Sequence, residues 1–148
     1  MSRPPDLPPL NAPTPELIAR FIDIVGPTQA LVDPAAQAPY LREWRDRYIG
    51  RTPLVLRPGT VEEVSRILAL AHEARIGIVP QGSSTGLVGG QIPFEDNRDV
   101  IVSVARLNRI RHVDPSGQSM IAEAGVTLIA IQQAAADAGR LFPLSLAA

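Results

Sequence analysis

Apolar positions recur with helical spacing in three segments of the chain. Residues 16–25 and 128–138 carry apolar side chains three or four positions apart, and these runs end at Gly26 and Gly139. A third run begins at Thr60 and ends at Gly77. Glycine commonly stands just past the last helical turn. The spacing therefore predicts three α-helices.

The third helix carries a recognisable start signal. Thr60 and Glu63 have the spacing of a capping box, in which the hydroxyl and the carboxylate each accept a hydrogen bond from an unpaired N–H. Gly77 is expected at the C′ position that ends the helix. The apolar residues expected on its buried face are Val61, Val64, Ile67, Leu68 and Ala71.

Short apolar runs indicate strands between these helices. Residues 54–57 precede the third helix and residues 78–80 follow it, which predicts a compact βαβ unit. Residues 100–104 indicate a buried strand, and residues 110–113 and 120–123 flank the turn sequence Asp114–Gly117. The expected fold is α+β, with a small βαβ subdomain followed by a mixed or antiparallel sheet with one helix.

Three regions follow from the composition along the chain. Residues 1–15 contain six prolines and are expected to form an extended arm. Residues 16–50 read as an N-terminal helical segment, and residues 51–148 as the main domain. The apolar run 141–148 has no terminating element and looks like the end of a cut chain, so the domain is expected to be incomplete at its C-terminus.

Composition narrows the function classes. The chain has 148 residues, a formal net charge of -1 and no cysteine. This charge gives no electrostatic footprint for nucleic acid, and without cysteine no thiolate metal site or cysteine-linked cofactor can form. No apolar run reaches the roughly 18 residues that span a bilayer, and the N-terminus lacks signal-peptide order. The expected location is the cytoplasm.

Residues 80–90 form the stretch that most clearly predicts a ligand. A strand leads directly into four glycines and three hydroxyl side chains. Glycines permit close approach of a ligand, and successive amides in one concavity bind phosphate oxygens. A flexible connector is the plain alternative, but the strand boundary, the hydroxyl residues and the apolar pair Leu87-Val88 count against it.

Two familiar phosphate loops do not match this stretch. A Walker loop requires a lysine, and all 14 basic residues of this chain are arginine. The dinucleotide fingerprint of Rossmann folds has different glycine spacing and opens a helix, whereas no helical pattern follows Gly90. The remaining interpretation is a diphosphate held by loop amides without a helix dipole and without a cation.

Residues 80–90 resemble the diphosphate loop of the FAD-linked oxidases that share a flavin domain with vanillyl-alcohol oxidase and p-cresol methylhydroxylase (PCMH). The most similar branch is that of the D-lactate, glycolate and D-2-hydroxyglutarate dehydrogenases. Further matches lie in family order at residues 57–64, 106–110, 123–128 and 142–144. The resemblance runs from about Leu54 to the last residue and implies a PCMH-type FAD-binding domain.

The resemblance implies a set of cofactor-binding residues. Backbone amides of the loop would hold the FAD diphosphate, with the Ser84 and Thr85 hydroxyls assisting. Residues near the C-terminus would approach the flavin or its ribityl chain, and Ser103 would line the same cleft. The full set is Pro80, Gln81, Gly82, Ser83, Ser84, Thr85, Gly86, Leu87, Gly89, Gly90, Ser103, Pro143 and Leu144.

The implied reaction is oxidation of a D-2-hydroxy acid, such as lactate, glycolate or 2-hydroxyglutarate, to the 2-oxo acid with hydride passing to flavin N5. We expect the chain to bind FAD without contributing a catalytic residue, and the substrate to be held by a missing C-terminal domain. An alternative stays open: a stand-alone, non-catalytic FAD- or nucleotide-binding module or subunit. Reading the gene beyond Ala148 separates the two.

The remaining candidate residues are better explained by structural roles than by roles in binding or catalysis. With only His72 and His112 and no cysteine, a metal site is not expected. No histidine lies between those two, so FAD is expected to be bound non-covalently. Arg106, Arg109 and Arg111 are interpreted as a solvated hairpin edge, with a basic patch beside the diphosphate as the alternative. Trp44 is expected to pack in the core, with stacking on a nucleotide base as the alternative.

Overall fold

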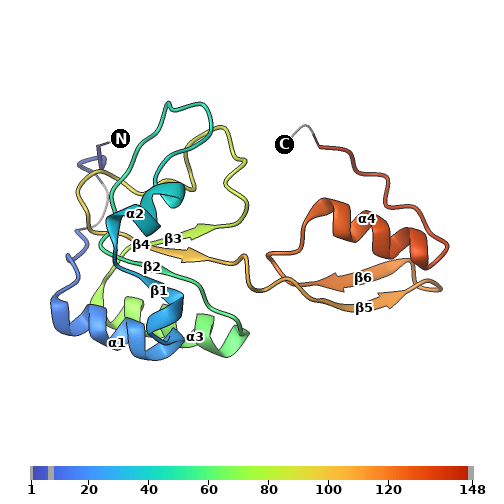
Figure 1. Cartoon of the computed structure of the whole chain (residues 1–148), viewed down its shortest axis with the longest axis horizontal. Coiled ribbons are helices and arrows are strands. Elements are labelled where there is room, and N and C mark those ends of the chain that lie inside the picture. Colours follow the sequence, from blue (N-terminus) through green and yellow to red (C-terminus); the bar gives the residue numbers. More distant parts are fainter. Residues whose placement is uncertain (1, 7–8, 147–148) are drawn as a thin grey trace.

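The computed structural model describes residues 2–6 and 9–146, which form two lobes joined by a short connection (Figure 1). The first lobe holds helices α1 (Pro15–Val25), α2 (Pro34–Gln37) and α3 (Val61–Ala74), two 3-10 turns at Pro27–Gln29 and Ala38–Tyr40, and a four-stranded sheet. The second lobe is a hairpin covered by α4 (Leu128–Asp137). The predicted α+β fold is confirmed.

The sheet of the first lobe has the order β1-β2-β4-β3. Its strands are β1 (Ala30–Leu31), β2 (Val55–Leu56), β3 (Ile78–Gln81) and β4 (Val100–Ser103). β4 lies between β2 and β3 and is parallel to both, whereas β1 is antiparallel to β2. The two strands of the predicted βαβ unit are therefore separated by β4. Residues 82–99 form the crossover that connects adjacent parallel strands β3 and β4.

Helices α1 and α3 pack on one face of this sheet (Figure 1). Phe21 of α1, Ile67 of α3 and Leu56 of β2 have no exposed surface and lie in one apolar cluster. Because side chains alternate across a strand, Leu54 and Leu56 both join this cluster. The helices and the sheet thus share one core, which includes residues on both sides of residue 50.

The buried face of α3 differs from the prediction. Ile67, Leu70 and Ala71 are buried, but Val61 and Leu68 are 49% and 47% exposed, so their predicted burial is wrong. Each residue turns the helix by about 100°. Once Ile67 and Ala71 face the sheet, Leu68 is rotated toward solvent.

The ends of α3 follow local capping rules with two differences. The Thr60 hydroxyl accepts from the Glu63 N–H at 3.1 Å, as predicted, but the Glu63 carboxylate accepts from the N–H of Gly59 at 2.6 Å. The helix ends at Ala74, because Arg75 adopts a left-handed conformation with φ of +56°. Gly77 therefore lies beyond the end of the helix and is not its C′ residue. A Cβ on Gly77 would overlap the Asp99 carboxylate.

The second lobe is a hairpin of β5 (Ile110–Asp114) and β6 (Ser119–Ala122), which pair in antiparallel register. Asp114 accepts hydrogen bonds from the N–H groups of Ser116 and Gly117, which closes the predicted turn. α4 begins after Thr127, whose hydroxyl accepts from the Ala130 N–H at 3.4 Å. The predicted hairpin and final helix are confirmed.

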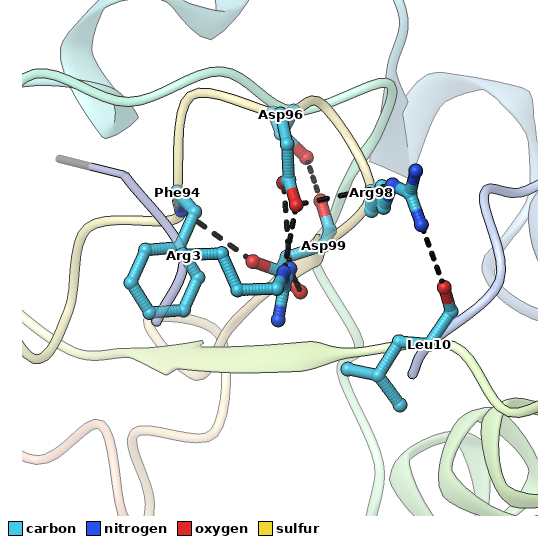
Figure 2. A network of polar contacts seen from close by, with 7 residues as sticks. Arg3, Leu10, Phe94, Asp96, Arg98 and Asp99 are labelled. Atoms are coloured by element: carbon cyan, nitrogen blue, oxygen red, sulfur yellow. Dashed lines mark hydrogen bonds and ion pairs between the residues drawn. The ribbon is translucent and has the colours of Figure 1, made fainter. Parts of the chain in front are cut away.

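The proline-rich arm lies against the first lobe without helix or strand in residues 2–6 and 9–14. The Asn11 side chain donates to the Ala74 carbonyl at 2.9 Å, and Arg98 donates to the Leu10 carbonyl at 3.0 Å (Figure 2). Arg3 inserts between Asp96 and Asp99. Positions 1 and 7–8 of the predicted arm lie outside the described residues.

Trp44 is 70% exposed, so its predicted place in the core is wrong. The neighbouring Glu43 takes the buried position instead, and its carboxylate accepts from the N–H groups of Arg45 and Arg47 at 2.8 and 2.6 Å. The Arg45 guanidinium lies over the Trp44 ring, 5.4 Å from its centroid. A buried carboxylate that caps a tight turn has displaced the aromatic side chain toward solvent.

Candidate functional site

The glycine loop, residues 82–90, leaves the carboxyl end of β3, on the side of the first lobe that faces the second (Figure 1). Its stem is held by Gln81, which is only 2% exposed. The Gln81 side-chain amide donates to the carbonyls of Tyr40 and Gln91 at 2.9 and 3.0 Å. These contacts close the base of the loop, so both amide hydrogens of Gln81 are used within the protein.

The backbone N–H groups of the glycine loop are free. Within residues 2–6 and 9–146, no acceptor receives a hydrogen bond from an N–H of residues 82–90. Most of the loop is exposed, although Gly89 is buried. Backbone amides are strong donors that are normally paired. The loop therefore presents a series of unused donors, which is what an anion-binding nest requires.

Ser84 gives a second indication of a ligand. Its backbone is left-handed, with φ of +58°. Its hydroxyl oxygen is buried and has no hydrogen-bond partner among the described residues. An unsatisfied buried polar group costs about 1–3 kcal/mol. A ligand oxygen that accepts from this hydroxyl would remove that cost.

A cavity of about 360 Å³ opens beside the first residues of the loop, between the two lobes. Ligand pockets commonly have volumes of this order or larger. Its walls come from the loop, from the connection after β4 and from the start of α4. The lining residues are Gly82, Ser83, Ala105, Asn108, Ala124, Gly125, Val126, Thr127 and Ala130.

Residues at the start of α4 also line this cavity, whereas the sequence suggested a phosphate site without a helix dipole. Thr127 and Ala130, at the first turn of α4, line the same cavity as Gly82 and Ser83. The first turn of a helix has unpaired N–H groups and a partial positive charge. The start of α4 in the second lobe and the start of the glycine loop in the first lobe therefore line one cavity.

Ala105, Asn108 and residues 124–127 line this cavity but were not among the predicted site residues. They meet because Gly125 approaches the turn after β4, where its N–H donates to the Leu107 carbonyl at 2.8 Å. A Cβ on Gly125 would overlap the Val104 carbonyl oxygen. The sequence signal that could have indicated these segments was the resemblance of residues 106–110 and 123–128 to the family. That resemblance did not show which of their residues face the cavity.

The arginines beside the cavity are engaged in hydrogen bonds within the protein. Arg109 and Arg111 both bind the buried carboxylate of Glu123, at 2.8 and 3.1 Å. The side-chain hydrogen bond from Arg109, supported by its backbone N–H and by Arg111, lowers the pKa of Glu123 to about 2. Arg106 donates to the Arg57 carbonyl at 2.7 Å. This arrangement supports the hairpin-edge interpretation over a basic patch.

The structure does not bring all predicted site residues together. Ser103 is buried opposite Gln81 in the sheet and does not line the cavity at the loop. Pro143 lines a separate cavity of about 380 Å³ beside the hairpin turn, and the Leu144 carbonyl accepts from Gln132 of α4 at 2.9 Å. Residues 141–146 follow α4 (Figure 1), so contact of Pro143 and Leu144 with a cofactor stays a prediction.

Glycine is required at one position of the loop, and a side chain would be crowded at a second. Gly89 has φ of +77°, and a Cβ there would lie 2.8–3.0 Å from the Tyr48 ring. A Cβ on Gly86 would lie 3.0 Å from the Gln91 side-chain oxygen. Gly82 and Gly90 have no atom within 4 Å of such a Cβ. The strict requirement thus falls at Gly89, whereas a side chain at Gly86 requires a small shift of the Gln91 side chain.

Other site types find no support in the described part of the chain. No group of three histidine, aspartate or glutamate side chains is placed to hold a metal ion among residues 2–6 and 9–146. None of the helices described is long and apolar enough to cross a membrane.

Comparison with known proteins identifies relatives of this chain. The family described as "FAD binding domain" matches residues 52–148. A putative mitochondrial D-lactate dehydrogenase of Schizosaccharomyces pombe is 33% identical over 86% of this chain and 25% of its own length. The mitochondrial D-2-hydroxyglutarate dehydrogenase of Arabidopsis thaliana is 34% identical over 88% of this chain and 23% of its own length. The chain spans about a quarter of the length of these relatives.

Solved structures share the fold. Alkyldihydroxyacetonephosphate synthase superposes with a TM-score of 0.74 at 22% identity, over 90% of this chain and 26% of that chain. Substrate-bound p-cresol methylhydroxylase superposes with a TM-score of 0.65 at 20% identity, over 84% of this chain and 24% of that chain. The predicted PCMH-type fold is confirmed.

The expectation of a cytoplasmic location is contradicted by these relatives. The dehydrogenases of Schizosaccharomyces pombe, Bos taurus and Arabidopsis thaliana are named as mitochondrial proteins. Net charge and the lack of a long apolar run do not distinguish one soluble compartment from another, so composition was an insufficient basis for that prediction.

Proposed function

This chain belongs to the family of FAD binding domains, and from that premise we propose that it holds FAD at the glycine loop as part of a flavin-dependent dehydrogenase of D-2-hydroxy acids. The observation that carries the proposal is the buried Ser84 hydroxyl, which has no partner among the described residues, in a loop whose amides donate to none of them. Both are hydrogen-bond donors to an anion. A diphosphate provides the acceptor oxygens that they lack.

The residues present fit the diphosphate of FAD. Loop amides donate to its oxygens, the Ser84 hydroxyl adds a donor, and the first turn of α4 faces the same cavity. Gln81 and Gln91 hold the loop rather than the ligand. The proposed binding set keeps Pro80, Gly82, Ser83, Ser84, Thr85, Gly86, Leu87, Gly89, Gly90, Ser103, Pro143 and Leu144.

Bound FAD supplies the acceptor for the hydride that leaves the hydroxyl-bearing carbon of the substrate. The chain itself contributes binding and orientation, which is the usual division of labour with a cofactor. In this proposal residues 51–148 carry the FAD-binding domain, preceded by the helical segment 16–50 and the arm 1–15. Both described relatives are named for the oxidation of D-2-hydroxy acids, which supports this substrate class.

The test is to purify the full-length protein and record its visible absorption spectrum with and without added FAD. We expect a flavin spectrum that persists after gel filtration. Acid should then release the flavin from the protein, which shows that FAD is bound non-covalently. Colourless protein that does not retain added FAD overturns the cofactor proposal.

The substrate class needs its own measurement. Under anaerobic conditions, D-lactate, glycolate or D-2-hydroxyglutarate should bleach the flavin absorbance, with the L enantiomers of lactate and 2-hydroxyglutarate as controls. Flavin that is bound but bleached by none of these acids contradicts the dehydrogenase assignment and favours a binding module.

A further inference from the structure

The side chain of Gln91 lies against the inside of the glycine loop. Its amide nitrogen Nε2 donates to the Gly86 carbonyl at 2.7 Å and to the Ser84 carbonyl at 3.4 Å. A primary amide has two N–H donors. Both donors of Gln91 are therefore spent on carbonyls of the loop.

Fixing these two carbonyls also fixes two N–H groups. In a trans peptide the C=O of one residue and the N–H of the next are coplanar and point in opposite directions. The Ser84 carbonyl shares its peptide with the Thr85 N–H, and the Gly86 carbonyl shares its peptide with the Leu87 N–H. Because both carbonyls point at Gln91, both N–H groups point away from it.

Backbone hydrogen bonds anchor Gln91 and the residue that follows it. Its backbone carbonyl accepts from the side chain of buried Gln81 at 3.0 Å, and the next residue, Ile92, donates its N–H to the Gly89 carbonyl at 3.0 Å. The absence of a side chain at Gly86 leaves room for the Gln91 side chain, because a Cβ at Gly86 would lie 3.0 Å from the Gln91 side-chain oxygen. The backbone at Gln91 is thus anchored, and its half-buried side-chain amide is held by the Ser84 and Gly86 carbonyls.

We propose that Gln91 is a positioning residue for FAD, which sets the Thr85 and Leu87 amides as a pair of donors to the diphosphate. This inference rests on the proposed function. It gives a role to the two loop carbonyls that accept from Gln91, whose peptides carry the unpaired Thr85 and Leu87 N–H groups. The support is neutral, so it orients the peptides without adding a charge to the site.

The test compares FAD affinity with stability in the full-length protein. The variants are Gln91→Glu, which keeps the size but removes the donors, and Gln91→Leu, which removes all polar contacts. Gln133→Leu is the control, because the Gln133 amide donates to the exposed Asp137 side chain at 2.8 Å, outside the loop and outside the proposed binding set. Dissociation constants for FAD and for ADP are measured by flavin fluorescence and by displacement, and the melting temperature of the apoprotein by circular dichroism.

Both Gln91 variants should raise the dissociation constants for FAD and ADP by about tenfold or more, the effect of losing roughly one well-placed charged hydrogen bond. Gln133→Leu should stay within about twofold of the wild type. A purely structural role would lower the melting temperature and leave the affinity of the folded protein unchanged, which overturns the inference.

A second route guards against variants that fail to fold. Gly86→Ala leaves Gln91 intact but crowds its side chain, and it should weaken FAD and ADP binding in the same direction. Wild-type affinity in Gly86→Ala and in the folded Gln91 variants refutes the positioning role while the proposed function stands. A wild-type protein that binds neither FAD nor ADP refutes the proposed function itself.

Discussion

Arg3 and Asp99 lie 96 positions apart in the chain and form an ion pair with 2.7 Å between guanidinium nitrogen and carboxylate oxygen (Figure 2). The Asp99 side chain is only 4% exposed. The same guanidinium donates to Asp96 at 2.7 Å and lies over the Phe94 ring, 4.7 Å from its centroid. The arm thereby holds the segment that returns from the glycine loop to β4.

The first prediction concerns this ion pair. Arg3→Gln leaves the buried Asp99 carboxylate without its cationic partner, and we expect a loss of about 2–4 kcal/mol in the free energy of unfolding. Urea denaturation followed by circular dichroism measures it. Arg20→Gln is the control, because the Arg20–Glu73 pair has side chains 57% and 71% exposed and should contribute under about 0.5 kcal/mol. Equal losses in both variants would contradict a special role of the arm.

Ser84 leads to a prediction with opposite signs for stability and binding. Ser84→Ala removes a buried hydroxyl that has no partner among the described residues, so the apoprotein should be as stable as the wild type or more stable by up to about 1 kcal/mol. FAD affinity should fall about five- to tenfold, because a donor to the diphosphate is lost. Thermal melting and flavin fluorescence measure the two quantities.

The control for Ser84→Ala is Ser65→Ala, on the exposed side of α3. This change should affect neither melting temperature nor FAD affinity. If Ser84→Ala instead destabilises the apoprotein and leaves FAD binding intact, the hydroxyl serves the fold and not the ligand.

Glycine substitutions should separate the two halves of the loop. Gly89→Ala forces a side chain into φ of +77° against the Tyr48 ring, and we expect a cost of about 1–2 kcal/mol or more. Gly82→Ala meets no atom within 4 Å and should cost under about 0.5 kcal/mol. Chemical denaturation of the two variants side by side measures the difference. A larger cost at Gly82 than at Gly89 would refute this assignment.

The Glu123 carboxylate predicts a pH dependence of stability. Its pKa is lowered from 4.5 to about 2, mainly by the hydrogen bond from Arg109. The folded state thus binds fewer protons than the unfolded state between these values, so stability rises with pH there. The contribution of Glu123 is complete above about pH 4.5 and is lost as pH falls toward 2.

Melting temperatures recorded from pH 2 to pH 6 test this dependence. Glu123→Gln should flatten the acid slope, because the group no longer titrates, while Glu73→Gln, at a side chain 71% exposed, should keep the wild-type slope. An unchanged slope in Glu123→Gln would show that other carboxylates govern acid unfolding. Asp96 is one of these, since the hydrogen bond from Arg3 lowers its pKa as well.

Local signals in the sequence were enough for the elements that depend on neighbouring residues. Thr60 and Thr127 mark the starts of α3 and α4 because a capping hydroxyl acts within three residues. The turn at Asp114 is closed by N–H groups two and three residues later. The glycine loop was found for the same reason, since its donors are contiguous in the chain.

Contacts between distant residues were decided by the tertiary structure alone. The insertion of β4 between β2 and β3, the approach of the α4 N-terminus to Gly82 and the Arg3–Asp99 pair all join segments 20 or more positions apart. Glu43 is buried in place of Trp44 because its carboxylate accepts from two backbone N–H groups. The spacing of apolar residues in the sequence does not reveal such hydrogen bonds.

The sequence by itself determined the loop chemistry, most of the helix starts and, through its ordered motifs, the resemblance to FAD-linked oxidases. Only the tertiary structure decided which loop amides are free among the described residues, which loop glycine is sterically required, and which distant segments line the cavity beside the loop. The reason is physical: a cap or a turn is formed by residues a few positions apart, whereas a binding site is formed by packing that brings separate segments together.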